Sequence, residues 1–294
     1  MIDSTGAQTA PDFHDEQDVV RPMPDQRWED FTGRTVVVSG CSSGIGAATA
    51  DQLLARGARV IGLDLNSPAV PGIEYVEVDL ASSASIERAL ASLDGEVHGL
   101  VNAAGVSAGI NDPLKVVSIN FAGLRELTEG VVERMPPDSY VVNTSSLAAA
   151  DYALRLDLLR DLVSTADREQ ALQWCREHPD ALGNGYALSK EAVIAYTSAR
   201  CVAFAQRGIR INCTAPGVTD TPILRHSAAS VGQAYLDAIP KPLGRIATPE
   251  EQASVLVFLA SPGASYLTGQ VLWVDGGYTA GVAAGEIEPM ALKR

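Results

Sequence analysis

Residues 35–57, TVVVSGCSSGIGAATADQLLARG, decide the fold. A β-branched run enters a turn with three glycines, and a helical pattern follows at once. Such a turn brings backbone N–H groups and the positive end of a helix dipole to one point, where a pyrophosphate can bind at close range. An ordinary strand-to-helix turn needs only one glycine. The residues predicted to hold a dinucleotide are Gly40, Ser42, Ser43, Gly44, Ile45 and Gly46.

The rest of the chain repeats this strand-then-helix pattern. Short apolar runs such as ARVIGLDL, GLVNAAG and GQVLWVDGG alternate with amphipathic stretches. About seven strands with no linker between them predict an α/β fold, a single doubly wound Rossmann-type domain with a central parallel sheet, over residues 31–280. Residues 1–30, acidic and proline-dotted, are expected to form an N-terminal extension, and residues 281–294 a C-terminal tail.

Two segments depart from the pattern. Residues 151–182, rich in Leu, Arg, Asp and Glu, predict two short helices inserted into a loop. Residues 221–245 are predicted to form an apolar substrate lid, and the insertion is expected to add a second wall to the same pocket. Packed faces of surface helices are the alternative. The apolar residues in question are Ile223, Leu224, Val231, Tyr235, Leu236 and Ile239 in the lid and Tyr152, Leu154, Leu156 and Leu158 in the insertion.

Composition excludes several functional classes. The 294 residues include 36 acidic and 22 basic ones with no basic run, which argues against nucleic acid as a partner. The four cysteines and four histidines are scattered, so neither a disulfide framework nor a metal site is expected. The N-terminus is acidic and no run of about 18 apolar residues occurs, which predicts no membrane association and a cytoplasmic location.

Two acidic residues follow predicted strands on the nucleotide side. Asp64 ends the second strand, about 20 residues after the glycine turn, where a carboxylate can accept hydrogen bonds from the adenosine ribose. The same carboxylate would repel a 2′-phosphate, which favours NAD over NADP. Asp79, with Leu80 beside it, ends the third strand and could reach the adenine amino group or cap a turn.

Three residues suggest proton transfer. Tyr186 and Lys190 are four apart, so they share one face of their predicted helix. A tyrosine that accepts a proton near neutral pH needs its pKa lowered by roughly 2 to 3 units, which an adjacent ammonium and a positive nicotinamide ring can supply. Ser146 follows a predicted strand and can hold a substrate oxygen, although its neighbour Ser145 competes for that role.

In this order and spacing, the glycine turn, Asn102-Ala103-Ala104-Gly105, Asn120, Ser146, Tyr186-x-x-x-Lys190 and Pro216-Gly217 resemble the classical short-chain dehydrogenase/reductases. The resemblance covers about residues 31 to 280 and makes Ser146 the catalytic serine. It implies that the Asn120 carbonyl holds a proton-relay water and that Thr221 binds the nicotinamide carboxamide. The cofactor-binding residues it adds are Asn102, Ala103, Ala104, Gly105, Tyr186, Lys190, Pro216, Gly217, Val218, Thr219 and Thr221.

The chief departure from the family is the 40-position separation of Ser146 and Tyr186, because of the insertion. Similar insertions occur in a subgroup that looks like 3α-hydroxysteroid dehydrogenase/carbonyl reductase. The family usually forms tetramers through the helix that carries Tyr186, so the insertion could cover that surface and leave a homodimer in place of a homotetramer.

The expected function is that of an NAD-dependent oxidoreductase that interconverts a bulky apolar secondary alcohol and its ketone, with a hydroxysteroid or a cyclic, terpenoid-like alcohol as the leading substrate. A smaller aryl or aliphatic secondary alcohol is the alternative. Epimerases and dehydratases that recycle bound NAD share the Tyr-x-x-x-Lys pattern but usually show another glycine spacing, and a non-catalytic dinucleotide-binding protein is the remaining possibility.

Overall fold

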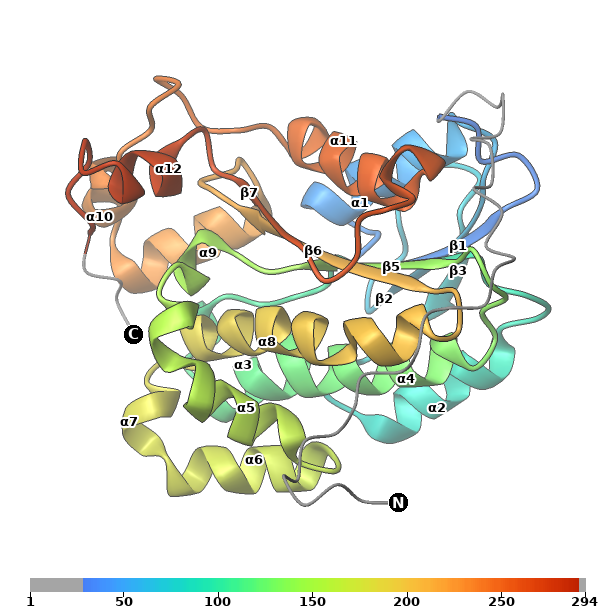
Figure 1. Cartoon of the computed structure of the whole chain (residues 1–294), viewed down its shortest axis with the longest axis horizontal. Helices are drawn as coiled ribbons and strands as arrows, with labels where there is room; N and C mark the ends of the chain where they lie inside the picture. Colours follow the sequence, from blue (N-terminus) through green and yellow to red (C-terminus); the bar gives the residue numbers. More distant parts are fainter. Residues whose placement is uncertain (1–28, 291–294) are drawn as a thin grey trace, which may run out of the picture.

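Seven parallel strands form the central sheet of the computed structural model, in the order β3-β2-β1-β4-β5-β6-β7 (Figure 1). The predicted α/β fold with a parallel sheet of about seven strands is confirmed. The order reverses between β1 and β4, the switch point where ligands gather in open α/β sheets. The strands are β1 (Thr35–Ser39), β2 (Arg59–Asp64), β3 (Glu74–Glu77), β4 (Gly99–Asn102), β5 (Tyr140–Thr144), β6 (Arg210–Pro216) and β7 (Val271–Val274).

The structure describes residues 29–290. The predicted extension at 1–30 therefore lies outside the described residues except for its last two positions, as do the last four positions of the predicted tail. No helix within the described range is long and apolar enough to cross a membrane.

Helices cover both faces of the sheet, as Figure 1 shows. Successive side chains of a strand point to opposite faces, so Val37 joins one hydrophobic core while Val36 and Val38 join the other. The first core is covered by α2 (Ser83–Ser92), α3 (Pro113–Val117), α4 (Leu124–Val132) and α8 (Tyr186–Ala205), and the second by α1 (Gly44–Leu54) and α11 (Pro249–Ala260).

A π-helical stretch, Ser118–Gly123, joins α3 to α4. π-Helical turns inside α-helices are rare and frequently occur at functional sites. This one contains Asn120, so the irregularity falls on a residue that the sequence singles out. Short 3-10 turns occupy Ala108–Ile110, Leu147–Ala149 and Pro262–Ala264.

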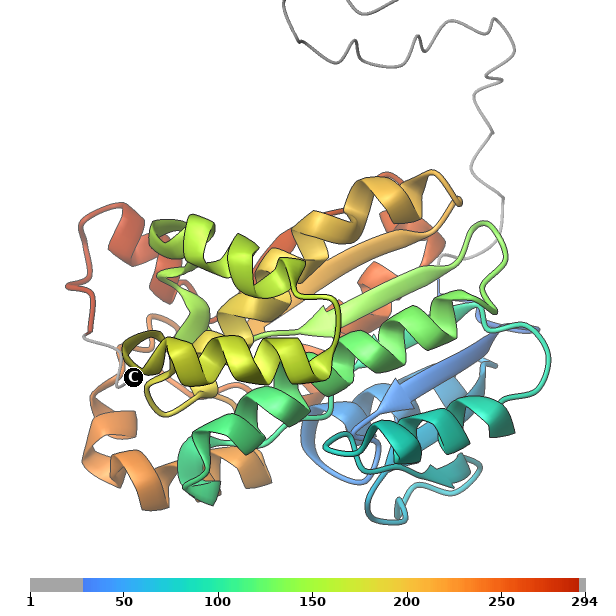
Figure 2. The ribbon, with the colours of Figure 1, turned by 90° about the horizontal axis from the view of Figure 1, so that it is seen from below.

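The insertion forms a third layer outside α8, which Figure 2 shows from below. The two predicted helices are present, as α5 (Leu156–Ser164) and α6 (Arg168–Glu177), between a 3-10 turn at Tyr152–Arg155 and the short α7 (Pro179–Leu182). Leu159 and Leu162 of α5 are fully buried in the core that α8 shares, so this layer is packed against the domain.

The predicted lid also contains helices. It folds as α9 (Pro222–Val231) and α10 (Gln233–Ala238), between β6 and α11. A further short helix, α12 (Tyr278–Ala283), follows β7. In Figure 1 these three helices lie at one end of the sheet, beside the carboxyl ends of the strands.

Candidate active site

A cavity of about 540 Å³ lies at the carboxyl ends of the strands. Its wall includes residues that follow β1, β2, β4, β5 and β6, together with residues of the lid. This volume is within the range of small-molecule and cofactor sites. The cavity therefore lies where the doubly wound topology predicts a ligand.

The glycine turn at the nucleotide end leaves no room for side chains. Gly40 has a φ of +77°, and a Cβ on it would lie 2.6 Å from the backbone nitrogen of Ala104. A Cβ on Gly46 would lie 2.1 Å from the carbonyl oxygen of Gly40. Helix α1 consequently starts tight against the sheet, and its N-cap residue Ser43 makes no side-chain capping hydrogen bond. Its first N–H groups fit a pyrophosphate.

Asp64 anchors the same turn. Its Oδ2 accepts a hydrogen bond from the Ser42 N–H at 3.0 Å, and its Oδ1 accepts one from the Asn66 N–H at 3.0 Å. The carboxylate lines the cavity, and each oxygen keeps a further lone pair for a ribose hydroxyl. Asp79 lies two residues beyond the end of β3, and its Oδ1 caps the turn by accepting from the Ala81 N–H at 2.8 Å.

Lys190 is buried in the cavity wall near Tyr186. Its Nζ donates to the carbonyl oxygen of Thr144 at 3.0 Å. A Cβ on Gly105 would lie 3.4 Å from this Nζ and 3.1 Å from Oδ1 of Asn120, so the loop after β4 passes directly beside both side chains. Burial lowers the pKa of Lys190 from 10.5 to about 8, which leaves it mostly protonated at neutral pH.

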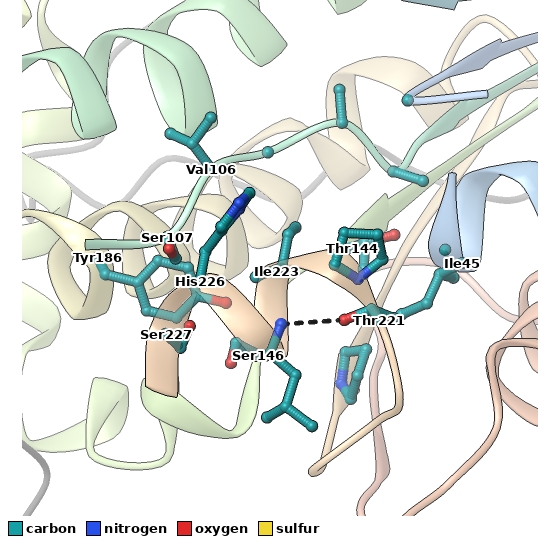
Figure 3. A pocket seen from close by; sticks show the side chains of 18 of the residues that line it. Ile45, Val106, Ser107, Thr144, Ser146, Tyr186, Thr221, Ile223, His226 and Ser227 are labelled. Atoms are coloured by element: carbon teal, nitrogen blue, oxygen red, sulfur yellow. Dashed lines mark hydrogen bonds between the residues drawn. The ribbon is translucent and has the colours of Figure 1, made fainter. Parts of the chain in front are cut away.

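The structure separates the two adjacent serines. Ser145 is buried, and its Oγ donates to the Lys190 carbonyl oxygen at 2.7 Å. Ser146 lines the cavity together with Tyr186, and its Oγ accepts from the Ala148 N–H at 3.1 Å. Figure 3 shows Ser146 and Tyr186 on the same wall of the pocket. This geometry supports Ser146 rather than Ser145 as the serine that meets a substrate.

Burial is the main influence on the pKa of Tyr186. Burial raises it above its ordinary value, and the hydrogen bond with Ser146 acts in the opposite direction without overcoming burial. The sequence argument combines the neighbouring ammonium with a positive nicotinamide ring, and that combined effect stays a prediction. A positive group next to the phenol has to supply the preference for phenolate.

Three predicted site residues lie behind the wall. Gly46 packs on the glycine turn, and Asn102 donates from Nδ2 to Thr128 Oγ1 and Asn143 Oδ1 at 2.9 and 2.8 Å. The Asn120 side chain accepts from the N–H of Val106 and donates to its carbonyl. The predicted residues that line the cavity are Gly40, Ser42, Ser43, Gly44, Ile45, Asp64, Asp79, Leu80, Ala103, Ala104, Gly105, Ser146, Tyr186, Lys190, Pro216, Gly217, Val218, Thr219 and Thr221.

The lid lines the cavity and the insertion does not. Thr221 caps α9 by accepting from the Leu224 N–H at 3.3 Å, the dashed line in Figure 3, while its side chain stays in the wall. The predicted second wall is wrong, because Tyr152 packs against Trp273 and Leu154 is 85% exposed. Of the apolar residues predicted for the lid, those that line the cavity are Ile223, Leu224, Tyr235, Leu236 and Ile239, whereas the side chain of Val231 lies outside what is described.

Four polar residues in the cavity wall were not predicted from the sequence. Ser107, Asn184, His226 and Ser227 all line the cavity, and Figure 3 shows three of them near Tyr186. Asn184 accepts from the Tyr186 N–H at 2.9 Å, which a position two residues before the tyrosine could have suggested. The other three carry no motif, and only their place in the lid or after β4 connects them to the site.

Comparison with known proteins agrees with this geometry. The family model described as short chain dehydrogenase matches residues 34–155, and the one described as Enoyl-(Acyl carrier protein) reductase matches residues 180–279. A coniferyl-alcohol dehydrogenase of Pseudomonas sp. (strain HR199 / DSM 7063) is 36% identical over 248 residues, covering 84% of this chain and 97% of that protein. The chain belongs to the short-chain dehydrogenase family.

Two further relatives are 3-alpha-hydroxysteroid dehydrogenases, which is the subgroup that the sequence resembles. The 3-alpha-hydroxysteroid dehydrogenase/carbonyl reductase of Comamonas testosteroni is 34% identical over 253 residues, covering 83% of this short-chain dehydrogenase and 96% of that protein. The crystal structure of 3-alpha-hydroxysteroid dehydrogenase from Pseudomonas sp. B-0831, complexed with NADH, superposes with a TM-score of 0.74 at 31% identity and covers 86% and 100% of the two chains. Membership makes this protein an alcohol oxidoreductase of the kind that uses a nicotinamide dinucleotide.

The buried lysine predicts a pH-dependent stability. The pKa of Lys190 is about 8 in the folded chain, against 10.5 for an ordinary lysine. At a pH where Lys190 is protonated in both the folded and the unfolded chain, this difference lowers the free energy of unfolding by about 3 kcal/mol. Between pH 8 and 10.5 the unfolded chain binds more protons, so this cost fades as the pH rises. We expect Lys190→Met to raise the free energy of unfolding at pH 7, with a smaller gain at pH 9.5, in urea unfolding of the cofactor-free protein. The exposed Lys115→Met is the control and should show no such trend; a gain for Lys190→Met that is independent of pH would contradict the argument.

Proposed function

We propose that this protein is an NAD-dependent alcohol dehydrogenase that interconverts a bulky, neutral secondary alcohol and its ketone. The observation that carries the proposal is one continuous cavity whose wall contains the glycine turn at one end and Ser146, Tyr186 and Lys190 at the other. A dinucleotide and an alcohol can therefore meet in it.

The residues support a simple division of labour. Ser146 Oγ holds the alcohol oxygen beside Tyr186, and the Tyr186 phenolate removes the hydroxyl proton as the carbinol carbon gives up its hydride. Lys190 stays charged near neutral pH and keeps the Thr144 carbonyl as its partner. A bound oxidised nicotinamide supplies the hydride acceptor and the positive charge that favours the phenolate. The glycine turn, Asp64 and Thr221 would hold this cofactor.

Substitution of the base tests the proposal directly. Tyr186→Phe deletes only the hydroxyl, so we expect NADH binding to persist while kcat for alcohol oxidation falls by about 10² to 10⁴. Tyr235→Phe, which removes another phenol from the same cavity, is the matched control and should keep most of the rate. A Tyr186→Phe enzyme with more than about a tenth of the wild-type rate would remove Tyr186 from this role.

The charges around the cavity support NAD over NADP. Asp64 lies at the nucleotide end, and among the described residues of the wall only Lys190 and His226 can carry a positive charge. Lys190 is at the opposite end of the site, where its Nζ contacts Thr144. A 2′-phosphate would therefore meet a carboxylate with no compensating cation.

Wild-type enzyme should accordingly prefer NAD, on the order of a hundredfold in kcat/KM, and Asp64→Ala should narrow this preference. Asp79→Ala is the control, since this carboxylate also lines the cavity but caps a turn; it should weaken both cofactors alike. Equal use of NADP by the wild type would refute the electrostatic argument.

The substrate end favours a neutral, bulky molecule. Apolar lid residues from α9 and α10 form much of its wall, and no arginine or glutamate is among the cavity residues. A carboxylate or phosphate would lose its hydration there without gaining a partner. A hydroxysteroid or cyclic alcohol fits this chemistry, and the likeness to a 3-alpha-hydroxysteroid dehydrogenase/carbonyl reductase supports such substrates by association.

NADH formation from a panel of alcohols tests this choice. We expect kcat/KM to be highest for 3α-hydroxysteroids or cyclic alcohols, intermediate for aryl alcohols such as coniferyl alcohol, and at least about tenfold lower for short 2-hydroxy acids, because an anion pays a desolvation cost. A preference for the hydroxy acids would show that the lid does not select apolar ligands.

Assembly as a symmetric homodimer stays a prediction. Helix α5 packs along α8, and Arg155 of the insertion forms a buried ion pair with Glu191 of that helix. The insertion therefore occupies part of the surface through which the family usually forms tetramers.

A further inference from the structure

Arg168, the first residue of the inserted helix α6, extends away from the insertion into the domain. Its side chain is 12% exposed and ion-pairs with Glu126 of α4 at 2.6 Å. A guanidinium has five N–H donors, and here each one has an acceptor. These acceptors are Ser83 Oγ and Glu126 for Nε, the Ser118 carbonyl and Oγ for Nη1, and the Leu80 carbonyl and Glu126 for Nη2.

Two of these acceptors belong to segments that build the dinucleotide site. Arg168 Nη2 donates to the Leu80 carbonyl at 2.9 Å, and Leu80 lines the cavity beside Asp79. Arg168 Nη1 donates to the Ser118 carbonyl at 3.0 Å, at the start of the π-helical stretch. One side chain of the insertion thus joins the two segments.

The π-helical stretch also packs closely against the turn at Leu80 on the side away from Arg168. A Cβ on Gly123, at the end of the π-helical stretch, would lie 2.3 Å from the Leu80 carbonyl oxygen. The Leu80 carbonyl is therefore enclosed between the π-helical stretch and the Arg168 guanidinium. Any movement of the guanidinium releases one side of the turn that carries Leu80.

An ion pair alone does not require this arrangement. Glu126 could be neutralised by a lysine, whose three donors radiate from one nitrogen and cannot reproduce the planar fork. The fork is needed to reach both backbone carbonyls while the carboxylate is bound. The Arg168 guanidinium therefore holds the Leu80 and Ser118 carbonyls in place in addition to neutralising Glu126.

We propose that Arg168 is a positioning residue that the insertion contributes to the dinucleotide site, and that it sets the affinity for the adenosine half of the cofactor by fixing the turn at Leu80. The inference rests on the proposed function only in that the cavity binds a nicotinamide dinucleotide. It assigns the insertion a role in cofactor binding although no residue of it lines the cavity.

Equilibrium binding of NADH and of ADP-ribose, which lacks the nicotinamide, tests the inference. We expect Arg168→Met to raise both dissociation constants by about tenfold, as for the loss of a charged hydrogen bond, while kcat at saturating NAD changes by less than about threefold. Arg160→Met is the matched control, because Arg160 lies in the same insertion and makes only an exposed pair with Asp157. It should leave both constants unchanged.

A double variant separates positioning from stability. Arg168→Met leaves the partly buried Glu126 carboxylate without its cation and should lower Tm. Arg168→Met with Glu126→Gln removes that charge, so Tm should recover while both dissociation constants stay raised. Arg168→Lys, the fallback if Arg168→Met fails to fold, should keep Tm near that of the wild type and still bind both ligands more weakly.

Two results would overturn the proposal. One is that Arg168→Met binds NADH and ADP-ribose with dissociation constants within about twofold of the wild-type values. If Arg168→Met does not fold, the same result for Arg168→Lys would count equally. The other is recovery of the affinities in step with Tm in the double variant, which is what a purely structural role predicts. A wild-type protein that binds neither ligand would overturn the proposed function along with this inference, whereas normal wild-type binding confines the failure to Arg168.

Discussion

The structure depends on the close approach of Gly46 to the carbonyl of Gly40. With any side chain at position 46, a Cβ only 2.1 Å from that oxygen would force α1 away from β1. The helix N-terminus would then leave the switch point, and the backbone N–H groups that fit a pyrophosphate would go with it. The same turn packs on Ala104, so it also sets the position of the loop after β4. One steric constraint therefore places both halves of the dinucleotide site.

Buried side-chain hydrogen bonds connect the sheet to helix α8. Asn102 at the end of β4 donates to Asn143 of β5, and Asn143 donates to Thr197 of α8 at 2.9 Å. Each of these groups would cost free energy if it were buried without a partner, so the bonds restrict how α8 can sit on the sheet. Tyr186 and Lys190 occupy the first turns of that helix. Their placement is thus determined from beneath the cavity, by residues that are not part of its wall.

The sequence predicts most of the fold because the pattern is local. Strand and helix periodicity, the glycine turn and the four-residue spacing of Tyr186 and Lys190 each depend on neighbours in the chain. The prediction that failed, a second cavity wall from the insertion, depends on contacts between segments that are far apart in the chain. The outward direction of Leu154 follows the docking of the whole insertion, and the burial that raises the pKa of Tyr186 is likewise not visible in the composition. His226 enters the cavity only because α9 folds over it.

The insertion is the clearest case in which local sequence patterns predict the helices but not their position. Neither family model covers residues 156–179, and the sequence of the segment resembles amphipathic surface helices. In the fold it is fixed by two arginines, Arg155 to the fully buried Glu191 and Arg168 to Glu126. Buried ion pairs are weak sources of stability, because desolvation offsets their attraction, but they are strict about geometry. The buried pair directed at α8 and the partly buried pair directed at α4 therefore fix the added layer in one position, and this makes it part of the framework that holds the site.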